Sequence, residues 1–385
     1  MNTSLPIPST EQLEHSARLI QVIHDKIAAH GGWISFSRYM ELALYAPGLG
    51  YYSAGTKKFG AAGDFVTAPE ISPLFARTLA RQVAQVLATT GGDVLELGAG
   101  TGRLAAQLLL ELQQLDTLPR SYLILEVSAH LRVVQQETLA ASLPVDLLSR
   151  VEWLDALPDA FIGLVLGNEV LDALPVHIVA WRDSGVFERG VAWDDGRLVW
   201  QESALTDGAL LENAQQLALP PGYISEICLA AFALIASLAR MLQRGALLFV
   251  DYGFPRREYY HPQRASGTLM CHYRQHAHDD PLFQPGLQDI TAHVDFTAVA
   301  EAGESHGLEL IGYTTQAQFP INCGIIDLLS AVSPADMAAY LPYASQAQKL
   351  LSPSEMGELF KVIAFGKNLE IAPLGFMRGD KRHVL

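Results

Sequence analysis

The segment Val94–Leu109 reads VLELGAGTGRLAAQLL and constrains the fold more than any other part of the chain. A short apolar run leads into Gly98, Gly100 and Gly102, and apolar residues at helical spacing follow. A strand that turns on glycines into a helix is typical of a βα unit that binds a nucleotide-like ligand at the start of the helix. Such units build parallel sheets, so this segment favours an α/β protein.

From Asp93 onward, short apolar runs alternate with segments whose apolar residues recur at helical intervals. This alternation is typical of crossover units, in which helices connect parallel strands. It predicts an α/β, Rossmann-like fold with a seven-stranded, mainly parallel sheet. The predicted strands are residues 94–97, 121–127, 151–154, 164–167, 246–251, 308–313 and 359–365. The predicted helices after the glycines are residues 103–115, 129–141, 223–243 and 294–306.

Three segments interrupt the alternation. Residues 176–203 carry Asp195-Gly196 between two strand-like runs, which is the signal of a two-residue β-hairpin. Residues 252–292 are rich in His, Pro and Gly and predict a long loop, and residues 314–358 predict helices between the last two strands. We expect these segments to be insertions into the parallel sheet.

The residues next to the glycine loop narrow the choice of its ligand. Arg103 occupies the position of the third glycine of the dinucleotide fingerprint, and no Lys-Ser or Lys-Thr follows, as a P-loop requires. Glu96, two residues before Gly98, would repel a pyrophosphate but would attract the α-ammonium of S-adenosylmethionine. We therefore predict S-adenosylmethionine as the cofactor, bound at Glu96, Gly98, Gly100 and Gly102.

Two further acids follow neighbouring predicted strands. Glu126 lies where α/β nucleotide-binding folds place an acid that accepts hydrogen bonds from ribose hydroxyls. Asp155 follows the third strand and is the candidate for contact with the adenine amino group. The alternative is that either acid is a solvated strand end, and the sequence leaves this open.

The segment GNEVLDALPVH after the fourth strand carries the candidate catalytic residues Asn168, Glu169 and Asp172. The carboxyl ends of parallel strands border the ligand crevice of an open sheet. Glu169 and Asp172 are three residues apart, so on a helical turn they would share a face. Paired carboxylates can hold a guanidinium bidentately and accept a proton after methyl transfer. Alternatively, Asp172 caps a helix.

Charge and cysteine usage exclude several classes of partner. The formal net charge of −15 makes duplex nucleic acid and anionic membranes unfavourable partners. No apolar run is long enough to span a bilayer, and we expect no membrane span. Cys228, Cys271 and Cys323 form no C-x-x-C pair, which argues against a structural zinc site. The clumped His, Cys and Asp residues of 271–280 favour a loop over the active site rather than a metal centre, so no metal is expected.

Five segments of the chain carry a resemblance to a known protein family. GDFVTAPEISPLF (residues 63–75), the glycine loop, GNEVLDALPVH, LLFVDYGF and PGLQDITAHVDFTAVAEA (residues 285–302) together resemble the MidA family. The resemblance spans residues 30–365. It implies a class I methyltransferase fold, and it adds Thr67 and Glu70 of the TAPEIS motif as candidate cofactor-binding residues.

The expected organisation has three parts. An N-terminal helical and loop region contributes to the site, a methyltransferase core binds the cofactor, and insertions form a substrate-binding cap. The respective ranges are 1–90 for the N-terminal region, 91–313 with 359–366 for the core, and 176–221, 252–292 and 314–358 for the cap.

Mitochondrial MidA proteins are protein arginine methyltransferases needed for respiratory complex I assembly. The resemblance therefore implies symmetric dimethylation of an arginine in a protein partner such as the 49-kDa-type subunit of complex I. The first dozen residues contain no Arg and include Glu11, unlike a mitochondrial presequence, so we expect a bacterial, cytoplasmic member. A small-molecule methyltransferase and a non-catalytic S-adenosylmethionine-binding assembly factor stay open as alternatives. So does the oligomeric state, with a homodimer as one option.

Overall fold

The computed structural model describes residues 5–54, 68–333 and 335–385. The chain forms two compact units, which are described separately. The sheet unit comprises Val66–Leu171, Leu234–Arg256 and Val294–Leu385, and the antiparallel unit comprises Met1–Phe65, Asp172–Ala233 and Arg257–His293. In this division residues 314–358 lie in the sheet unit, and the predicted roles of the three parts of the chain stay predictions.

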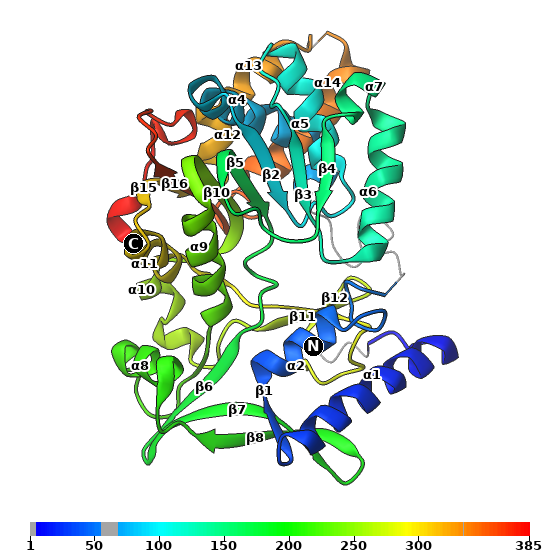
Figure 1. The fold of residues 1–385 in the computed structure, drawn as a ribbon, viewed down its shortest axis with the longest axis vertical. Helices are drawn as coiled ribbons and strands as arrows, with labels where there is room; N and C mark the ends of the chain where they lie inside the picture. Colours follow the sequence, from blue (N-terminus) through cyan, green and yellow to red (C-terminus); the bar gives the residue numbers. More distant parts are fainter. Residues whose placement is uncertain (1–4, 55–67, 334) are drawn as a thin grey trace. The chain divides into compact units, whose positions relative to one another are not determined.

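The sheet unit is built on one large mixed sheet, which confirms the predicted α/β fold (Figure 1). The order of its strands is β15-β16-β10-β5-β2-β3-β4, and β14 pairs with β10 beside this path. All pairs among β10, β5, β2, β3 and β4 are parallel, whereas β16 is antiparallel to both of its neighbours. The bounds of the strands are β2 Asp93–Leu97, β3 Tyr122–Leu125, β4 Val151–Leu154, β5 Phe161–Asn168, β10 Leu242–Phe254, β14 Val294–Asp295, β15 Glu309–Thr315 and β16 Phe360–Lys367.

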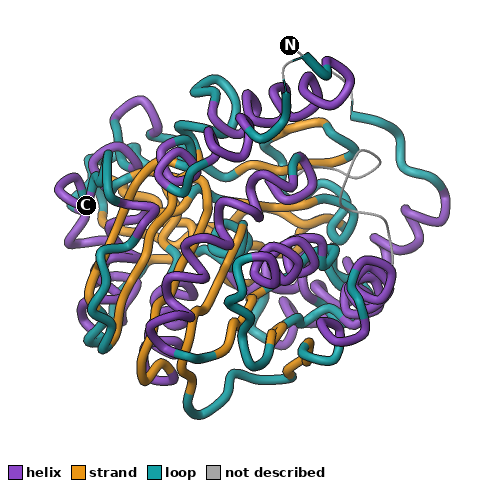
Figure 2. Tube along the Cα trace, turned by 90° about the horizontal axis from the view of Figure 1, so that it is seen from above, coloured by secondary structure: helices purple, strands orange, loops and turns teal. Residues whose placement is uncertain are grey.

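Helices flank the side-by-side strands of this sheet, which are drawn in orange in Figure 2. Helix α4 packs against α5 and β5, and α11 packs against β15, because each buries an apolar stripe. The glycine segment folds as predicted, with β2 leading through the loop into α5. The helices of this unit are α3 Ala68–Ile71, α4 Pro73–Thr90, α5 Arg103–Gln114, α6 Ala129–Ser142, α7 Val145–Leu148, α11 Phe296–Ser305, α12 Gln318–Asn322, α13 Ile325–Ser330, α14 Met337–Leu351 and the 3₁₀ turns η2 Leu374–Phe376 and η3 Arg382–Val384.

The antiparallel unit contains two smaller sheets. In the first, the order is β1-β7-β6-β9 with β8 paired to β7, and every pair is antiparallel. Strands β7 and β8 form the hairpin predicted at Asp195-Gly196. The second sheet has the order β12-β11-β13. The strands are β1 Trp33–Ser35, β6 His177–Arg182, β7 Gly185–Asp194, β8 Arg197–Ala204, β9 Ile224–Ile227, β11 Met270–Tyr273, β12 His276–His278 and β13 Asp289–Thr291; the helices are α1 Thr10–Ala29, α2 Phe36–Tyr45, α8 Gly208–Leu217 and the 3₁₀ turn η1 Pro262–Arg264.

Two predicted elements are wrong in part. The helix expected at 223–243 is divided, because residues 224–227 pair with β6 as strand β9 and the helix α9 spans only Leu229–Met241. The long loop expected at 252–292 contains the short helix α10 (Arg256–Tyr259) and the β12-β11-β13 sheet. Strands β9 and β13 pair with residues far away in the chain, which local periodicity does not report, whereas β11 and β12 form a local hairpin.

Among the residues that the structure describes, no helix combines the length and the apolar character needed to cross a bilayer.

Candidate functional site

The glycine loop connects β2 to α5 through backbone conformations that favour glycine. Gly98, Gly100 and Gly102 have φ angles of 59°, 53° and 81°. A side chain in this left-handed region is strained, so each glycine has a conformational reason to be there. Gly102 is also the N-cap of α5 and has no side-chain cap, so the first N–H groups of the helix face the loop without a capping oxygen.

Glu96 is buried in β2, 2% exposed, directly before this loop. The hydroxyl of Tyr122, on the neighbouring strand β3, donates a hydrogen bond of 2.7 Å to Glu96 Oε2. Burial raises the pKa of Glu96 to about 7, the Tyr122 hydrogen bond opposes this rise, and the negative charge of Glu126 adds to it. A carboxylate held so far from water is stabilised by any cation that reaches it.

Glu126 follows β3 and is also buried. Its Oε1 accepts a hydrogen bond of 2.9 Å from the backbone N–H of Ser128, and its Oε2 accepts one of 2.9 Å from Gln135 Nε2. Desolvation raises its pKa, and the hydrogen bonds from Ser128 and Gln135 with the charge of Arg132 work against the rise. The carboxylate is thus held by the protein while keeping acceptor capacity, as a ribose-binding acid needs.

Asp155 differs from the other predicted cofactor residues. Its side chain is 92% exposed and forms an ion pair of 2.8 Å with Arg132 of α6. Arg132 also donates to the main-chain oxygen of Glu126, so one guanidinium joins the ends of two neighbouring strands. The proposed contact between Asp155 and adenine stays a prediction.

The TAPEIS residues divide between described and undescribed parts of the chain. Thr67 lies outside the described residues. Glu70, in α3, accepts hydrogen bonds from Thr101 Oγ1 at 2.5 Å and from Arg103 Nη1 at 2.9 Å. Glu70 therefore binds side chains of the glycine loop itself, and its direct contact with a cofactor stays a prediction.

Asn168 and Glu169 stand at the carboxyl end of β5. Glu169 has a φ of 55°, a strained value for a residue with a side chain, and its N–H donates to Val250 O at 2.8 Å. Asn168 Nδ2 donates to Glu169 Oε1 at 3.4 Å, and Asn168 Oδ1 is buried with no hydrogen-bond partner among the described residues. Strained residues and unsatisfied polar atoms gather at functional sites, because the surrounding fold must hold them.

The helical turn expected to align Glu169 with Asp172 is absent. Residues 169–176 form bends and a turn between β5 and β6. The side chain of Asp251, on β10, binds the backbone at the start of this segment. Its Oδ2 accepts hydrogen bonds from the N–H groups of Val170 and Leu171, at 3.1 and 2.8 Å. Asp172 is buried and belongs to the antiparallel unit, and in the described chain the element that follows it is strand β6 rather than a helix.

Sequence reasoning missed several residues that support these acids. Tyr122 and Gln135 donate to Glu96 and Glu126, and Asp251 shapes the turn after β5. Asp251 lies in the LLFVDYGF motif, so the motif could have indicated it. The local sequence pattern does not indicate Tyr122 or Gln135.

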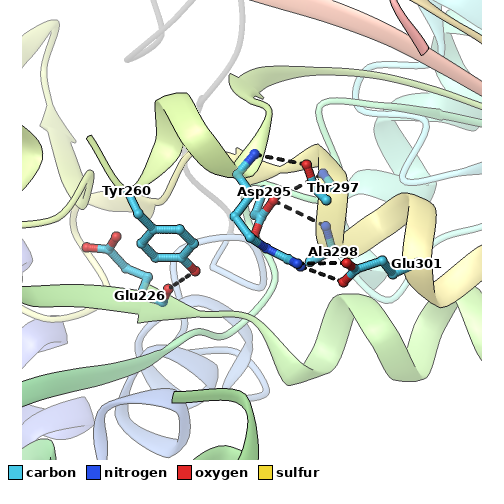
Figure 3. Close-up of polar contacts among 7 residues, drawn as sticks. Glu226, Tyr260, Asp295, Thr297, Ala298 and Glu301 are labelled. Carbon is cyan, nitrogen blue, oxygen red and sulfur yellow. Dashed lines mark hydrogen bonds and ion pairs between the residues drawn. The ribbon is translucent and has the colours of Figure 1, made fainter. Parts of the chain in front are cut away.

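Arg256, the first residue of α10, forms ion pairs with Asp295 and Glu301, which are labelled in Figure 3. Its two Nη atoms lie 2.7 and 2.5 Å from the carboxylate oxygens of Glu301. Its Nε lies 3.5 Å from Asp295, which caps α11 by accepting from the N–H groups of Thr297 and Ala298. Burial raises the pKa of Asp295 to about 6, against the effect of Arg256.

The His-, Cys- and Asp-containing segment 271–280 was considered above as a metal centre or a loop. In the described ranges, no group of three or more His, Cys, Asp or Glu side chains is arranged to hold a metal ion. Residues 271–278 lie in strands β11 and β12 or in the turn between them, and Cys271 is buried. The groups described around the glycine loop are carboxylates, a side-chain amide and backbone N–H groups.

Comparisons with known proteins agree with this chemistry. The profile of the Methyltransf_28 family, described as S-adenosyl-L-methionine-dependent methyltransferases, matches residues 76–314. The chain is 29% identical over 380 residues to the protein arginine methyltransferase NDUFAF7 of Danio rerio, which covers 89% of this chain and 85% of that protein. With the Homo sapiens NDUFAF7 protein it shares 28% identity, over 86% of this chain and 80% of that protein.

Two solved structures from Burkholderia thailandensis are similar over almost the whole chain. One, crystallised with S-adenosyl-homocysteine, is 52% identical, has a TM-score of 0.95 and covers 99% of this chain and 100% of its own. The other, a native structure, is 51% identical with a TM-score of 0.93 and the same coverage.

Proposed function

Since this chain belongs to the Methyltransf_28 family of S-adenosyl-L-methionine-dependent methyltransferases, we propose that it methylates the guanidinium of an arginine in a protein substrate. The arginine specificity is supported by the NDUFAF7 proteins, which are named protein arginine methyltransferases and align with most of this chain. The formal net charge of −15 is compatible with a cationic substrate.

The residues around the glycine loop fit the proposed cofactor. Glu96 is a buried carboxylate whose pKa is raised by desolvation, and the α-ammonium of the cofactor would supply a positive charge beside it. Glu126 is held by Ser128 and Gln135 and has acceptor capacity for the ribose hydroxyls. The left-handed glycines let the backbone approach a ligand closely.

The observation that carries the acceptor assignment is the strained Glu169 beside the unsatisfied Asn168 Oδ1. Both stand at the carboxyl end of β5, where open parallel sheets bind their ligands. A left-handed glutamate costs about 1 kcal/mol or more relative to a relaxed backbone, which the N–H bond to Val250 offsets. We assign Glu169 to guanidinium binding and Asn168 Oδ1 to acceptance of an N–H from a cationic ligand.

The bound cofactor supplies an electrophilic methyl on its sulfonium: a guanidino nitrogen forms the new N–C bond as the C–S bond breaks, and S-adenosylhomocysteine and one proton are released. Glu169 orients the guanidinium through charge-assisted hydrogen bonds and stabilises the proton that the attacking nitrogen loses. The role of Asp172 as a second carboxylate stays a prediction, which the Asp172→Asn variant tests separately.

We further propose symmetric dimethylation and a cytoplasmic location. A 49-kDa-type complex I subunit is the first protein to test as substrate, on the strength of the MidA resemblance. Radiolabelled S-adenosylmethionine incubated with the enzyme and a bacterial lysate should label protein, and acid hydrolysis should release methylarginine. Label that enters only small molecules would replace the arginine proposal with a small-molecule methyltransferase. Retained cofactor binding without any turnover would replace it with a non-catalytic binding protein.

Replacing the candidate carboxylates tests their roles. Glu169→Gln should lower the kcat/KM for the labelled protein roughly 10- to 150-fold, because a charge-assisted contact worth about 1.5–3 kcal/mol is lost. Asp172→Asn should act in the same direction. S-adenosylhomocysteine affinity and melting temperature should stay near those of the wild type. The exposed Glu137 of α6 provides the control Glu137→Gln, which should methylate normally; normal methylation by both test variants would contradict the assignment.

A further inference from the structure

Gln135 is a glutamine buried completely in the middle of α6. Its amide contacts three parts of the sheet unit that the sequence keeps apart. Nε2 lies 3.1 Å from the main-chain oxygen of Gly100 and 2.9 Å from Glu126 Oε2, and Oε1 lies 2.9 Å from Trp153 Nε1. Every hydrogen-bonding atom of this side chain is therefore engaged with the glycine loop, the acid after β3 or strand β4.

The chemistry of the three partners fixes the orientation of the amide. An indole N–H can only donate, so Trp153 must face the carbonyl oxygen of Gln135. A peptide oxygen and a carboxylate can only accept, so both amide hydrogens must point at Gly100 and Glu126. Turning the amide over would break all three hydrogen bonds. Unsatisfied polar atoms of a buried amide are strongly destabilising.

The backbone of Gln135 also approaches the loop closely. A Cβ added at Gly102 would lie 3.2 Å from Gln135 Cα and 3.4 Å from its Cβ. The φ of 81° at Gly102 favours glycine, and a Cβ there would also be in tight contact with α6. The loop and α6 are joined by packing as well as by the amide.

We propose that Gln135 is a positioning residue that aligns the Glu126 carboxylate with the glycine loop, so that the adenosyl ribose meets both in one geometry. This inference rests on the proposed binding of the cofactor at Glu126. The amide donates to Glu126 Oε2 while Ser128 N–H donates to Oε1, so the carboxylate is held at both oxygens and cannot rotate away. The same amide holds the Gly100 carbonyl, which sets the course of the loop beside the ribose.

The test uses the product S-adenosylhomocysteine and its 2′-deoxy analogue as calorimetric probes of the full-length protein. For the wild type, removal of the 2′-hydroxyl should weaken binding about tenfold, or about 1.4 kcal/mol. Gln135→Met keeps the length and volume of the side chain without its polar atoms. The substitution should weaken the binding of S-adenosylhomocysteine about tenfold but that of the deoxy analogue less than about twofold. The reason is that the 2′-hydroxyl is the group that hydrogen-bonds to the aligned carboxylate.

Two further variants keep this test decisive. Gln136 is the exposed neighbour of Gln135 on α6, so Gln136→Met should bind both probes as the wild type does. Trp153→Phe removes the indole N–H that fixes the amide and should show a weaker form of the Gln135→Met pattern. The fluorescence of Trp153 is obtained by subtracting the emission spectrum of Trp153→Phe from that of the wild type. We expect this contribution to change in the Gln135→Met variant.

The outcomes separate the two proposals. A wild type that binds neither probe contradicts the proposed cofactor site. A wild type that binds, with a Gln135→Met variant that loses both probes to the same extent, overturns the positioning role and leaves cofactor binding intact. If Gln135→Met does not fold, the Trp153→Phe variant alone decides between the two patterns.

Discussion

Each unit of the molecule buries a glutamate on a strand, and the two glutamates have opposite surroundings. Glu226 of β9, in the antiparallel unit, accepts hydrogen bonds from the N–H groups of Thr268 and Leu269 and from the hydroxyls of Thr268 and Tyr259, all at 3.0–3.1 Å. Tyr260 adds a hydrogen bond to the main-chain oxygen of Glu226 (Figure 3). Glu96 of β2, in the sheet unit, has one side-chain hydrogen bond with the described residues, which Tyr122 donates.

The donors around a buried carboxylate indicate whether the fold or a ligand compensates its charge. Glu226 is surrounded by donors from its own chain, so its charge is compensated by the fold and it fixes the segment after Gly267. Burial raises the pKa of Glu96 to about 7, and the described residues provide its side chain with fewer donors than Glu226 has. A satisfied buried carboxylate indicates a structural role, whereas an undersatisfied one next to a ligand-binding loop indicates a place for a cation.

The largest effect should come from the satisfied acid. Glu226→Gln places an NH₂ group against backbone N–H donors and removes the charge that they stabilise. We expect the free energy of unfolding to fall by about 3 kcal/mol, measured by urea denaturation followed by circular dichroism. The exposed Glu212 of α8 provides the control Glu212→Gln, which should change it by less than about 0.5 kcal/mol. A loss under about 1 kcal/mol for Glu226→Gln would remove the contrast between the two acids.

The reverse pattern is expected for Glu96→Gln. The variant should keep or slightly increase stability above pH 7, since it no longer buries a charge, and Tyr122 can still donate to the remaining oxygen. Affinity for S-adenosylhomocysteine should fall roughly 10- to 100-fold, because a charge-assisted contact with the ammonium is lost. Calorimetry at pH 8 measures the affinity. Wild-type affinity in the variant would show that Glu96 does not bind the ligand.

The smallest effect is a pH dependence carried by the same carboxyl. Below about pH 7 Glu96 is protonated and cannot pair with an ammonium, so wild-type affinity should rise roughly tenfold between pH 6 and pH 8. The stability that Glu96 contributes to the ligand-free protein has the opposite sign. Its raised pKa means that this contribution is present at low pH and is lost as the pH rises through about 7.

Glu96→Gln serves as the control for this titration, since it has no carboxyl to ionise. Its affinity should be nearly flat over the same range, apart from the smaller influence of Glu126, whose pKa is also raised. An equally steep rise in wild type and variant would assign the pH dependence to another group.

Much of the sheet unit could be predicted from the sequence, because its signals are local. Apolar runs that end in glycines or acids predict β2, β3, β4 and β5, and the helical spacing after Gly102 predicts α5. Strand β9 and the β12-β11-β13 sheet could not be predicted in this way. Their residues are short runs whose strand character comes from pairing with β6 or with each other.

Of the residues in the candidate site, only those that belong to a sequence motif could be predicted. Glu96 and Glu126 follow from their distance to the glycines and to a strand end, and whether they bind the cofactor stays a prediction. Tyr122 was not predictable as the partner of Glu96, because the contact depends on the register that sets Glu96 opposite Ile124. Gln135 looks like any polar residue of an amphipathic helix until α6 is placed against the glycine loop.

The position of β16 has a consequence for the order in which the sheet can form during synthesis. β16 lies between β10 and β15, although both of these strands precede it in the chain. Until residues 360–367 leave the ribosome, the backbone groups of β10 and β15 that will face β16 have no partner. Such open edges invite pairing with other chains, so the nascent protein is most prone to aggregate just before its last strand inserts. Closure of the sheet is in this respect a late, long-range event rather than a stepwise addition of neighbours.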